Sequence, residues 1–97
     1  MLQTYGLLFN MMESLGKKWV VPLLLFLLLI EETNFSKMKK HLRITSRILS
    51  RKLQLLEALG LVEKIVIDHP RKILYSLTDK GKAISNQLLH FYENLTN

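Results

Sequence analysis

The 97-residue sequence contains no cysteine, and this absence removes several kinds of chemistry. It excludes disulfide bonds, thiol-based redox sensing and the zinc sites that are built on pairs of cysteines. The sequence also lacks internal repeats, low-complexity segments and any interdomain linker. We therefore expect residues 1–97 to fold as a single domain.

Acidic residues are missing from the middle of the chain. No Asp or Glu occurs between Thr33 and Leu56, whereas seven Lys or Arg residues fall between positions 37 and 52. The net charge of the whole chain is +6. Positive charge concentrates a protein around phosphate backbones and anionic membranes alike, so its sign alone does not choose between these partners.

The sequence has no hydrophobic run of the length that a membrane-spanning helix needs. The run Trp19–Ile30 holds twelve apolar residues, whereas a spanning helix needs ~20, and the acidic Glu31-Glu32 ends the run. A signal peptide is disfavoured because eighteen residues, Glu13 among them, precede the run and no Ala-x-Ala-like cleavage site is present. We expect a helix that is buried all round, partly by its own domain and partly by a second copy, in a cytoplasmic protein without a membrane partner.

Helical spacing of apolar residues, together with capping residues, predicts a mainly α-helical fold of the α+β class. A short amphipathic helix ends at Gly16, the apolar helix follows it, and residues 31–34 form a polar break. A helix-turn-helix is expected over about residues 36–59, with Ser36 and Thr45 as the N-caps of its two helices.

A β-hairpin wing and a last helix are expected after Gly60, which closes the preceding helix as a left-handed residue. Runs of β-branched and aromatic residues flank a five-residue tip at Asp68–Lys72 and predict a two-stranded wing over about residues 61–77. Thr78-Asp79 cap a C-terminal helix over about residues 78–95.

The second helix of the helix-turn-helix has the residue types that read DNA. Leu49, Leu53 and Leu56 share one face, at the spacing i, i+4 and i+7. The opposite face, together with the helix start, carries Thr45, Ser46, Arg47, Ser50, Arg51 and Gln54. In the major groove Arg pairs with guanine, Gln pairs with adenine and Ser serves either, while hydroxyls at the helix start take a phosphate. An ordinary solvated face mixes charges of both signs, so the absence of acids favours contact with double-stranded DNA.

Further basic residues flank this helix. The preceding helix and turn carry Lys37, Lys39, Lys40 and Arg43. We expect these side chains to position the phosphate backbone rather than to read bases. The wing carries Lys64, Arg71 and Lys72. They would reach a minor groove or its phosphates, although generic solubilising charge is the alternative interpretation for these three.

No constellation for catalysis or metal binding is recognisable. The three histidines, His41, His69 and His90, are far apart and lack ligand-like spacing, so we expect no metal and no cofactor. Asp68-His69 falls at a loop tip with no nucleophile nearby, and turn chemistry explains it better. An enzyme is therefore the least favoured class.

Several short motifs occur in an order and spacing that resemble a known family. They are Gly16-Lys17-Lys18-Trp19, Phe35, Ile44-Thr45-Ser46-Arg47-Ile48-Leu49-Ser50, Leu53, Leu56-Glu57, Gly60-Leu61-Val62 and Pro70-Arg71-Lys72-Ile73-Leu74-Tyr75-Ser76-Leu77-Thr78-Asp79-Lys80-Gly81. Each piece alone is weak. Together, over about residues 16–82, they resemble the HxlR-type transcriptional regulators, winged-helix proteins related in fold to MarR-type regulators.

The resemblance implies a homodimer that binds a pseudo-palindromic operator and represses or activates transcription. It implies that residues 45–59 form the recognition helix, and that the first and last helices, with part of the apolar helix, form the dimer interface. The apolar candidates for that interface are Leu7, Leu8, Met11, Trp19, Leu88, Phe91, Tyr92 and Leu95. Many members of this family have a cysteine near the first helix that senses electrophiles or oxidants. This chain has none, which leaves its effector unassigned.

Two other functional classes stand beside a homodimeric, sequence-specific regulator that binds double-stranded DNA. A winged helix can instead dock on another protein, but that role would not require a basic, acid-free face. A basic protein anchored in a membrane by residues 19–30 would need detergent for extraction, whereas a regulator would not.

Overall fold

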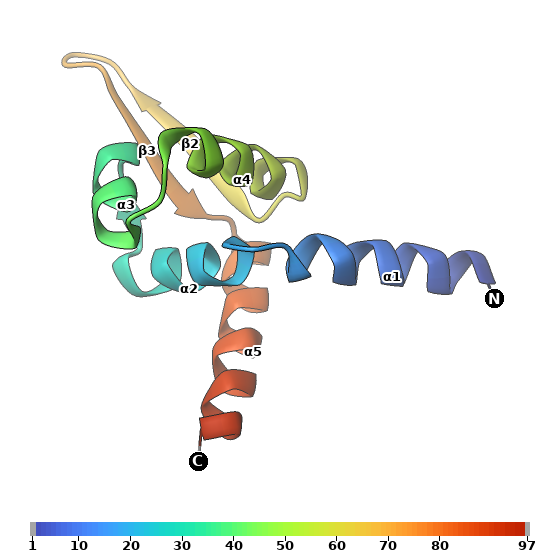
Figure 1. Cartoon of the computed structure of the whole chain (residues 1–97). Helices are drawn as coiled ribbons and strands as arrows, with labels where there is room; N and C mark the ends of the chain where they lie inside the picture. Colours follow the sequence, from blue (N-terminus) through green and yellow to red (C-terminus); the bar gives the residue numbers. More distant parts are fainter. Residues whose placement is uncertain (1, 97) are drawn as a thin grey trace.

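The computed structural model describes the backbone of residues 2–96 and the side chains of residues 5–96. Helices dominate the chain and a small sheet lies among them (Figure 1). In chain order the elements are α1 (Leu2–Gly16), α2 (Val20–Ile30), β1 (Glu32–Thr33), α3 (Phe35–Leu42), α4 (Ser46–Ala58), β2 (Val62–Ile67), β3 (Lys72–Leu77) and α5 (Asp79–Thr96). This arrangement confirms the predicted mainly helical winged helix-turn-helix.

Strands β2 and β3 form the hairpin that was predicted as a wing. They pair in antiparallel register from Val62 opposite Leu77 to Ile67 opposite Lys72. The tip is therefore residues 68–71, one residue shorter than predicted, because Lys72 belongs to the strand. In Figure 1 this end of the hairpin extends away from the helices.

The sheet contains a third strand that the sequence analysis did not predict. β1 pairs antiparallel with β3, so the strand order is β1-β3-β2, with Glu32 opposite Ser76 and Thr33 opposite Tyr75. The prediction of a mere polar break over residues 31–34 is therefore wrong. Two residues are too few to show the alternation by which a strand is recognised in a sequence. The strand ties the link between α2 and α3 to the middle of the sheet.

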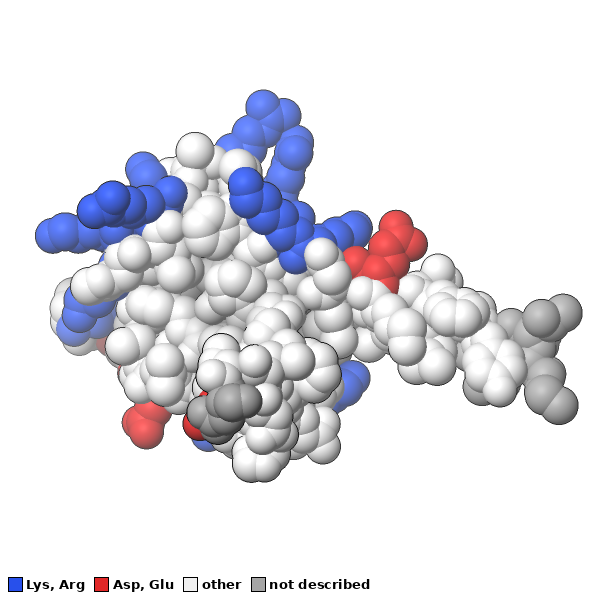
Figure 2. Space-filling view, turned by 60° about the horizontal axis from the view of Figure 1, so that its bottom comes forward, with Lys and Arg blue, Asp and Glu red and all other residues white. Residues whose placement is uncertain are grey.

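Helices α1 and α5 extend from the body in different directions (Figures 1 and 2). α1 packs mainly on α2, whereas α5 packs on α2 and β3. The radius of gyration is 14.4 Å. A compact chain of this length would have a value of about 12.5 Å, so the two helices leave part of their surface uncovered.

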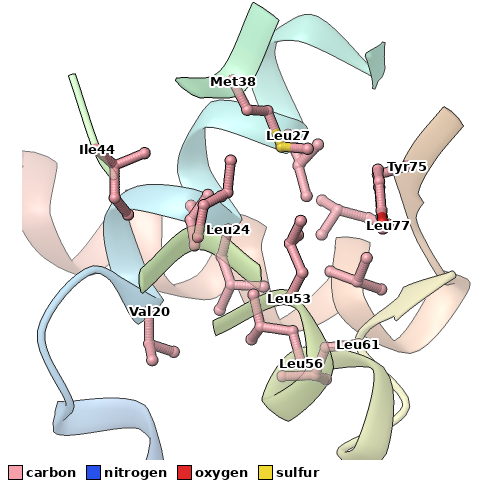
Figure 3. Packing of buried hydrophobic residues seen from close by; sticks show 13 residues of the cluster. Val20, Leu24, Leu27, Met38, Ile44, Leu53, Leu56, Leu61, Tyr75 and Leu77 are labelled. Carbon is pink, nitrogen blue, oxygen red and sulfur yellow. The ribbon is translucent and has the colours of Figure 1, made fainter. Parts of the chain in front are cut away.

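A cluster of buried apolar side chains joins α2, α3, α4 and the sheet (Figure 3). α2 contributes Leu23, Leu24 and Leu27, and the predicted apolar face of α4 contributes Leu49, Leu53 and Leu56. Burying one leucine side chain stabilises a fold by roughly 1.5–3 kcal/mol relative to leaving it exposed. The cluster therefore fixes which side of α4 faces inward, as the spacing of its leucines predicted.

α2 is only partly covered by its own chain. Its side facing the cluster is fully buried, but Leu29 is 71% exposed and Ile30 is 51% exposed in the last turn. The helix was predicted to be buried all round, partly by its own domain and partly by a second copy. Within a single chain, only the side that faces the cluster is buried. Among residues 2–96, no helix is long and apolar enough to cross a membrane.

Candidate nucleic-acid interface

The helix-turn-helix consists of α3 and α4, and α3 starts earlier than predicted. The backbone N–H of Lys37 donates to Oδ1 of Asn34 at 2.9 Å, so Asn34 is the N-cap. The prediction of Ser36 as the cap is wrong, because Ser36 lies in the first turn of the helix. The earlier start makes Phe35 the first helical residue, and its side chain packs against the core.

The turn between the two helices is built without glycine. Arg43 has a φ of 52°, in the left-handed region, and its N–H donates to the carbonyl oxygen of Lys39. This conformation costs a non-glycine residue about 1–2 kcal/mol. Thr45 then caps α4 as predicted, because the N–H of Ile48 donates to its Oγ1 at 3.3 Å. The turn thus keeps a cationic side chain at a position where glycine would be less strained.

The predicted reading residues lie on the outward side of α4. Thr45, Ser46, Arg47, Arg51 and Gln54 are exposed, and Ser50 is half-buried. We call these six residues the reading side. The leucines on the opposite face of the helix are buried, so packing holds the reading side in a fixed orientation. Hydroxyl, guanidinium and amide groups of this kind are the ones that contact base edges and phosphates in a major groove.

The predicted phosphate-positioning residues are exposed as well. They are Lys37, Lys39, Lys40 and Arg43 on α3 and the turn, and Lys64, Arg71 and Lys72 on the hairpin. α3 turns Met38 into the core, which leaves its lysines on the solvent side. The fold therefore joins the first group to the reading side in one motif. Of the hairpin group, Arg71 and Lys72 lie at the tip end, which extends from the body in Figure 1, whereas Lys64 pairs with Tyr75 in the three-stranded part of the sheet.

Charge is distributed unevenly over the molecule. In Figure 2, Lys and Arg side chains gather along the upper part of the view, whereas α1 and the end of α5 are largely uncharged. Glu31, Glu32 and Glu63 line a groove of about 530 Å³ between α2, the sheet and α5. These carboxylates lie outside the helix-turn-helix, whose single acidic residue, Glu57, lies near the end of α4, so the motif remains strongly positive.

One titratable group of the core, the hydroxyl of Tyr75, has a shifted pKa. Among residues 5–96, no cluster of His, Asp and Glu side chains is arranged to hold a metal ion. Burial raises the pKa of the Tyr75 hydroxyl, and the carboxylate of Glu57 raises it further. Tyr75 is therefore neutral near pH 7, and its ring is buried in the core.

Comparison with known proteins agrees with this geometry. The model of the HxlR-like helix-turn-helix family matches residues 14–96. The chain belongs to that family. YvaP, an uncharacterised HTH-type transcriptional regulator of Bacillus subtilis (strain 168), is 43% identical over 75 residues, which are 75% of this chain and 68% of YvaP.

Solved structures of regulators have the same fold. The redox regulator HypR in its oxidized form superposes with a TM-score of 0.80 and 28% identity, covering 93% of this chain and 95% of that one. The reduced form of the transcriptional regulator YodB from B. subtilis gives a TM-score of 0.75 and 27% identity, over 87% and 83% of the two chains. This HxlR-like chain is a DNA-binding transcriptional regulator, and such regulators are not enzymes. Since it has no cysteine, it has no thiol for a redox switch.

The HxlR-like chain exposes apolar side chains on its first and last helices. Of the eight residues predicted for a dimer interface, six are exposed: Leu7, Leu8, Met11, Phe91, Tyr92 and Leu95. Trp19 and Leu88 instead pack partly against the core of their own chain. Tyr5, Phe9 and Met12 are also exposed on α1, so apolar side chains project from more than one side of this helix.

α4 and α5 are tied together by hydrogen bonds, and we call this contact the junction. The hydroxyl of Thr78 donates to the carbonyl oxygen of Gly60 at 2.6 Å and accepts from the N–H of Gly81 at 3.0 Å. Nζ of Lys80 donates to the carbonyl oxygen of Leu59 at 3.2 Å. Gly60 has a φ of 73°, as its predicted role at the helix end requires. The junction joins the start of α5 to the end of α4, while the packing of α5 is mainly against α2.

Proposed function

We propose that this DNA-binding regulator acts as a homodimer that recognises a pseudo-palindromic site in double-stranded DNA. α4 of each copy enters the major groove with its reading side, and the two copies occupy grooves ~34–36 Å apart. The observation that supports this most is the reading side itself. It is exposed at five of six positions, lies opposite a buried apolar face and belongs to a segment without acidic residues.

The contacts of the proposed complex divide into reading and positioning. Arg47, Arg51 and Gln54 pair with base edges, and the hydroxyls at the start of α4 meet a phosphate. The lysines of α3 and the strained Arg43 hold the phosphate backbone beside the groove. The hairpin residues Lys64, Arg71 and Lys72 contact an adjacent minor groove or its phosphates. The first set provides specificity, and the other two provide affinity that depends on salt.

The exposed apolar side chains of α1 and α5 supply the contact between the two copies. Contiguous exposed apolar surface on a folded protein marks an interaction site. In this proposal the chain works as a single winged-helix unit in the cytoplasm, and its occupancy of the operator changes transcription of the neighbouring gene.

Selection of bound sites from a random duplex library tests the proposal. The expected result is a site with two-fold symmetry and half-sites about one helical turn apart. A protein that selects no sequence, yet binds another protein, would instead be a winged-helix docking module.

Two substitutions test the reading side. Arg47→Ala and Arg51→Ala should each lower discrimination between the selected site and a mismatched one by about 1–3 kcal/mol. Anisotropy titrations with both duplexes measure the difference. Lys82→Ala, which removes the same charge beside the acidic groove, is the matched control. Unchanged site preference in both arginine variants would show that another surface reads the DNA.

A further inference from the structure

A hollow of about 240 Å³ lies beside the reading side of α4. Its walls come from two segments that are distant in sequence. Lys18 and Trp19 belong to the turn before α2, and Ile48, Arg51 and Lys52 belong to α4. Of these five residues, only Arg51 has a part in the function proposed above. The sequence analysis gave Lys18 no role, because its neighbours across the hollow lie some thirty positions further along the chain.

The lining of the hollow combines positive charge with an apolar floor. All three ionisable side chains there, Lys18, Arg51 and Lys52, are cationic. Trp19 is half-buried and packs against the core, while Ile48 is 38% exposed. An indole and an isoleucine offer little to a bare inorganic anion, which prefers hydrogen-bond donors. They suit a ligand that has an anionic group joined to a body with C–H surfaces.

We infer that the hollow binds one sugar–phosphate unit of the DNA backbone. The phosphate lies between Lys18 and Lys52, beside Arg51, whose guanidinium reaches past it to the bases, and the deoxyribose covers Trp19 and Ile48. This inference rests on the proposed function, because it requires α4 to lie in the major groove. Arg51 lines the hollow and also belongs to the reading side, so the bound unit lies on a strand that borders this groove. The turn before α2 thereby becomes a third backbone clamp, besides α3 and the hairpin.

The salt dependence of DNA binding tests this assignment. Lys18→Ala should weaken the binding of the selected site and of a random-sequence duplex by the same factor, because a backbone contact carries no sequence information. It should also lower the slope of log affinity against log salt by about 0.9, the value for one lost phosphate contact. Lys18→Arg should keep the wild-type slope. Lys82→Ala is the control, and any change in its slope measures the effect of removing a positive charge far from the hollow.

Trp19 provides a second readout, since it is the only tryptophan of the chain. If a deoxyribose covers the indole, a short random-sequence duplex should shift the tryptophan emission to shorter wavelength in wild type. The shift should be lost on raising the salt, and inorganic phosphate alone should not produce it.

The two proposals fail in different ways. Wild type that binds no duplex would overturn the proposed function and this inference with it. If wild type selects an operator but its tryptophan emission does not shift when DNA binds, the inference alone would be overturned. The inference would also fail alone if the salt slope of Lys18→Ala matched that of Lys82→Ala.

Discussion

The helix-turn-helix and the two projecting helices differ in what they expose. α3 and α4 cover the core with leucines and Met38 and present Lys, Arg, Ser and Gln to solvent. α1 has no Lys or Arg and exposes Leu7, Phe9 and Met12, and the end of α5 exposes Phe91 and Leu95. Two copies of a basic surface repel each other, whereas two apolar surfaces associate in water. The difference supports the proposal that the regions serve different partners, DNA for the first and a second copy for the other.

The two regions are nevertheless mechanically linked. The junction bonds the end of α4 to the start of α5, and packing of α5 on α2 and β3 also holds its direction relative to the body that carries the reading side. In a symmetric dimer this direction determines how far apart the two reading sides lie. In the proposed dimer, the spacing of the operator half-sites would therefore depend partly on these hydrogen bonds.

The largest expected effect comes from placing a charge in the apolar region. Phe91→Glu removes an exposed aromatic side chain and would bury a carboxylate between the copies. It should weaken self-association by about 4 kcal/mol, roughly a thousandfold. Analytical ultracentrifugation over a range of protein concentrations measures this change.

The matched control for Phe91→Glu is Ala83→Glu, which adds a carboxylate at another exposed position of α5. The control should self-associate like wild type. Phe91→Glu should also lose affinity for the two-half-site operator while its affinity for a single half-site stays almost unchanged. If both variants remain dimeric, α5 is not the interface. The assignment of the apolar end of α5 to contact with a second copy would then be wrong.

A smaller effect is expected at the junction. Gly81 lies in the first turn of α5, and a Cβ there would overlap the carbonyl oxygen of Leu61. That oxygen accepts the N–H of Thr78 at 3.0 Å, so it cannot move without loss of a hydrogen bond. Gly81→Ala should lower the free energy of unfolding by about 3 kcal/mol in spite of the better helix propensity of alanine. Urea denaturation followed by circular dichroism measures the change.

Gly16→Ala is the control for this substitution, since nothing lies within 4 Å of a Cβ built at Gly16. It should leave the free energy of unfolding within about 0.5 kcal/mol of wild type. An equal stability of the Gly81→Ala variant and wild type would mean that α5 shifts freely at the junction. The link between the two regions would then be loose rather than fixed.

The parts of the fold that were predictable are those with long, periodic signals. Three leucines at helical spacing identified the buried face of α4, and Thr45 and Gly60 marked its two ends. The reading side followed from the same periodicity, because a residue opposite a buried face must face solvent. The order and spacing of the short motifs predicted the family, and the match over residues 14–96 confirmed it.

The parts that were missed depend on contacts between distant segments. β1 is a strand only because β3 lies beside it, and two residues show no pattern of their own. Asn34 rather than Ser36 is the cap because Phe35, which packs against the core, is already the first residue of the helix. Lys18 faces Arg51 and Lys52 only after α2 and α4 have packed together. Spacing within one helix could not have shown any of these three.

The smallest expected effect concerns one lysine of the basic region. Lys39 is exposed on α3 and is proposed to contact a phosphate, so Lys39→Ala should weaken operator and random duplex equally, by less than tenfold. The salt slope should fall by about one. Self-association should be unchanged, in contrast with the Phe91→Glu variant, and this contrast is the point of the experiment. If Lys39→Ala instead altered preference among sequences, α3 would read bases. The reading surface would then extend across both helices of the motif.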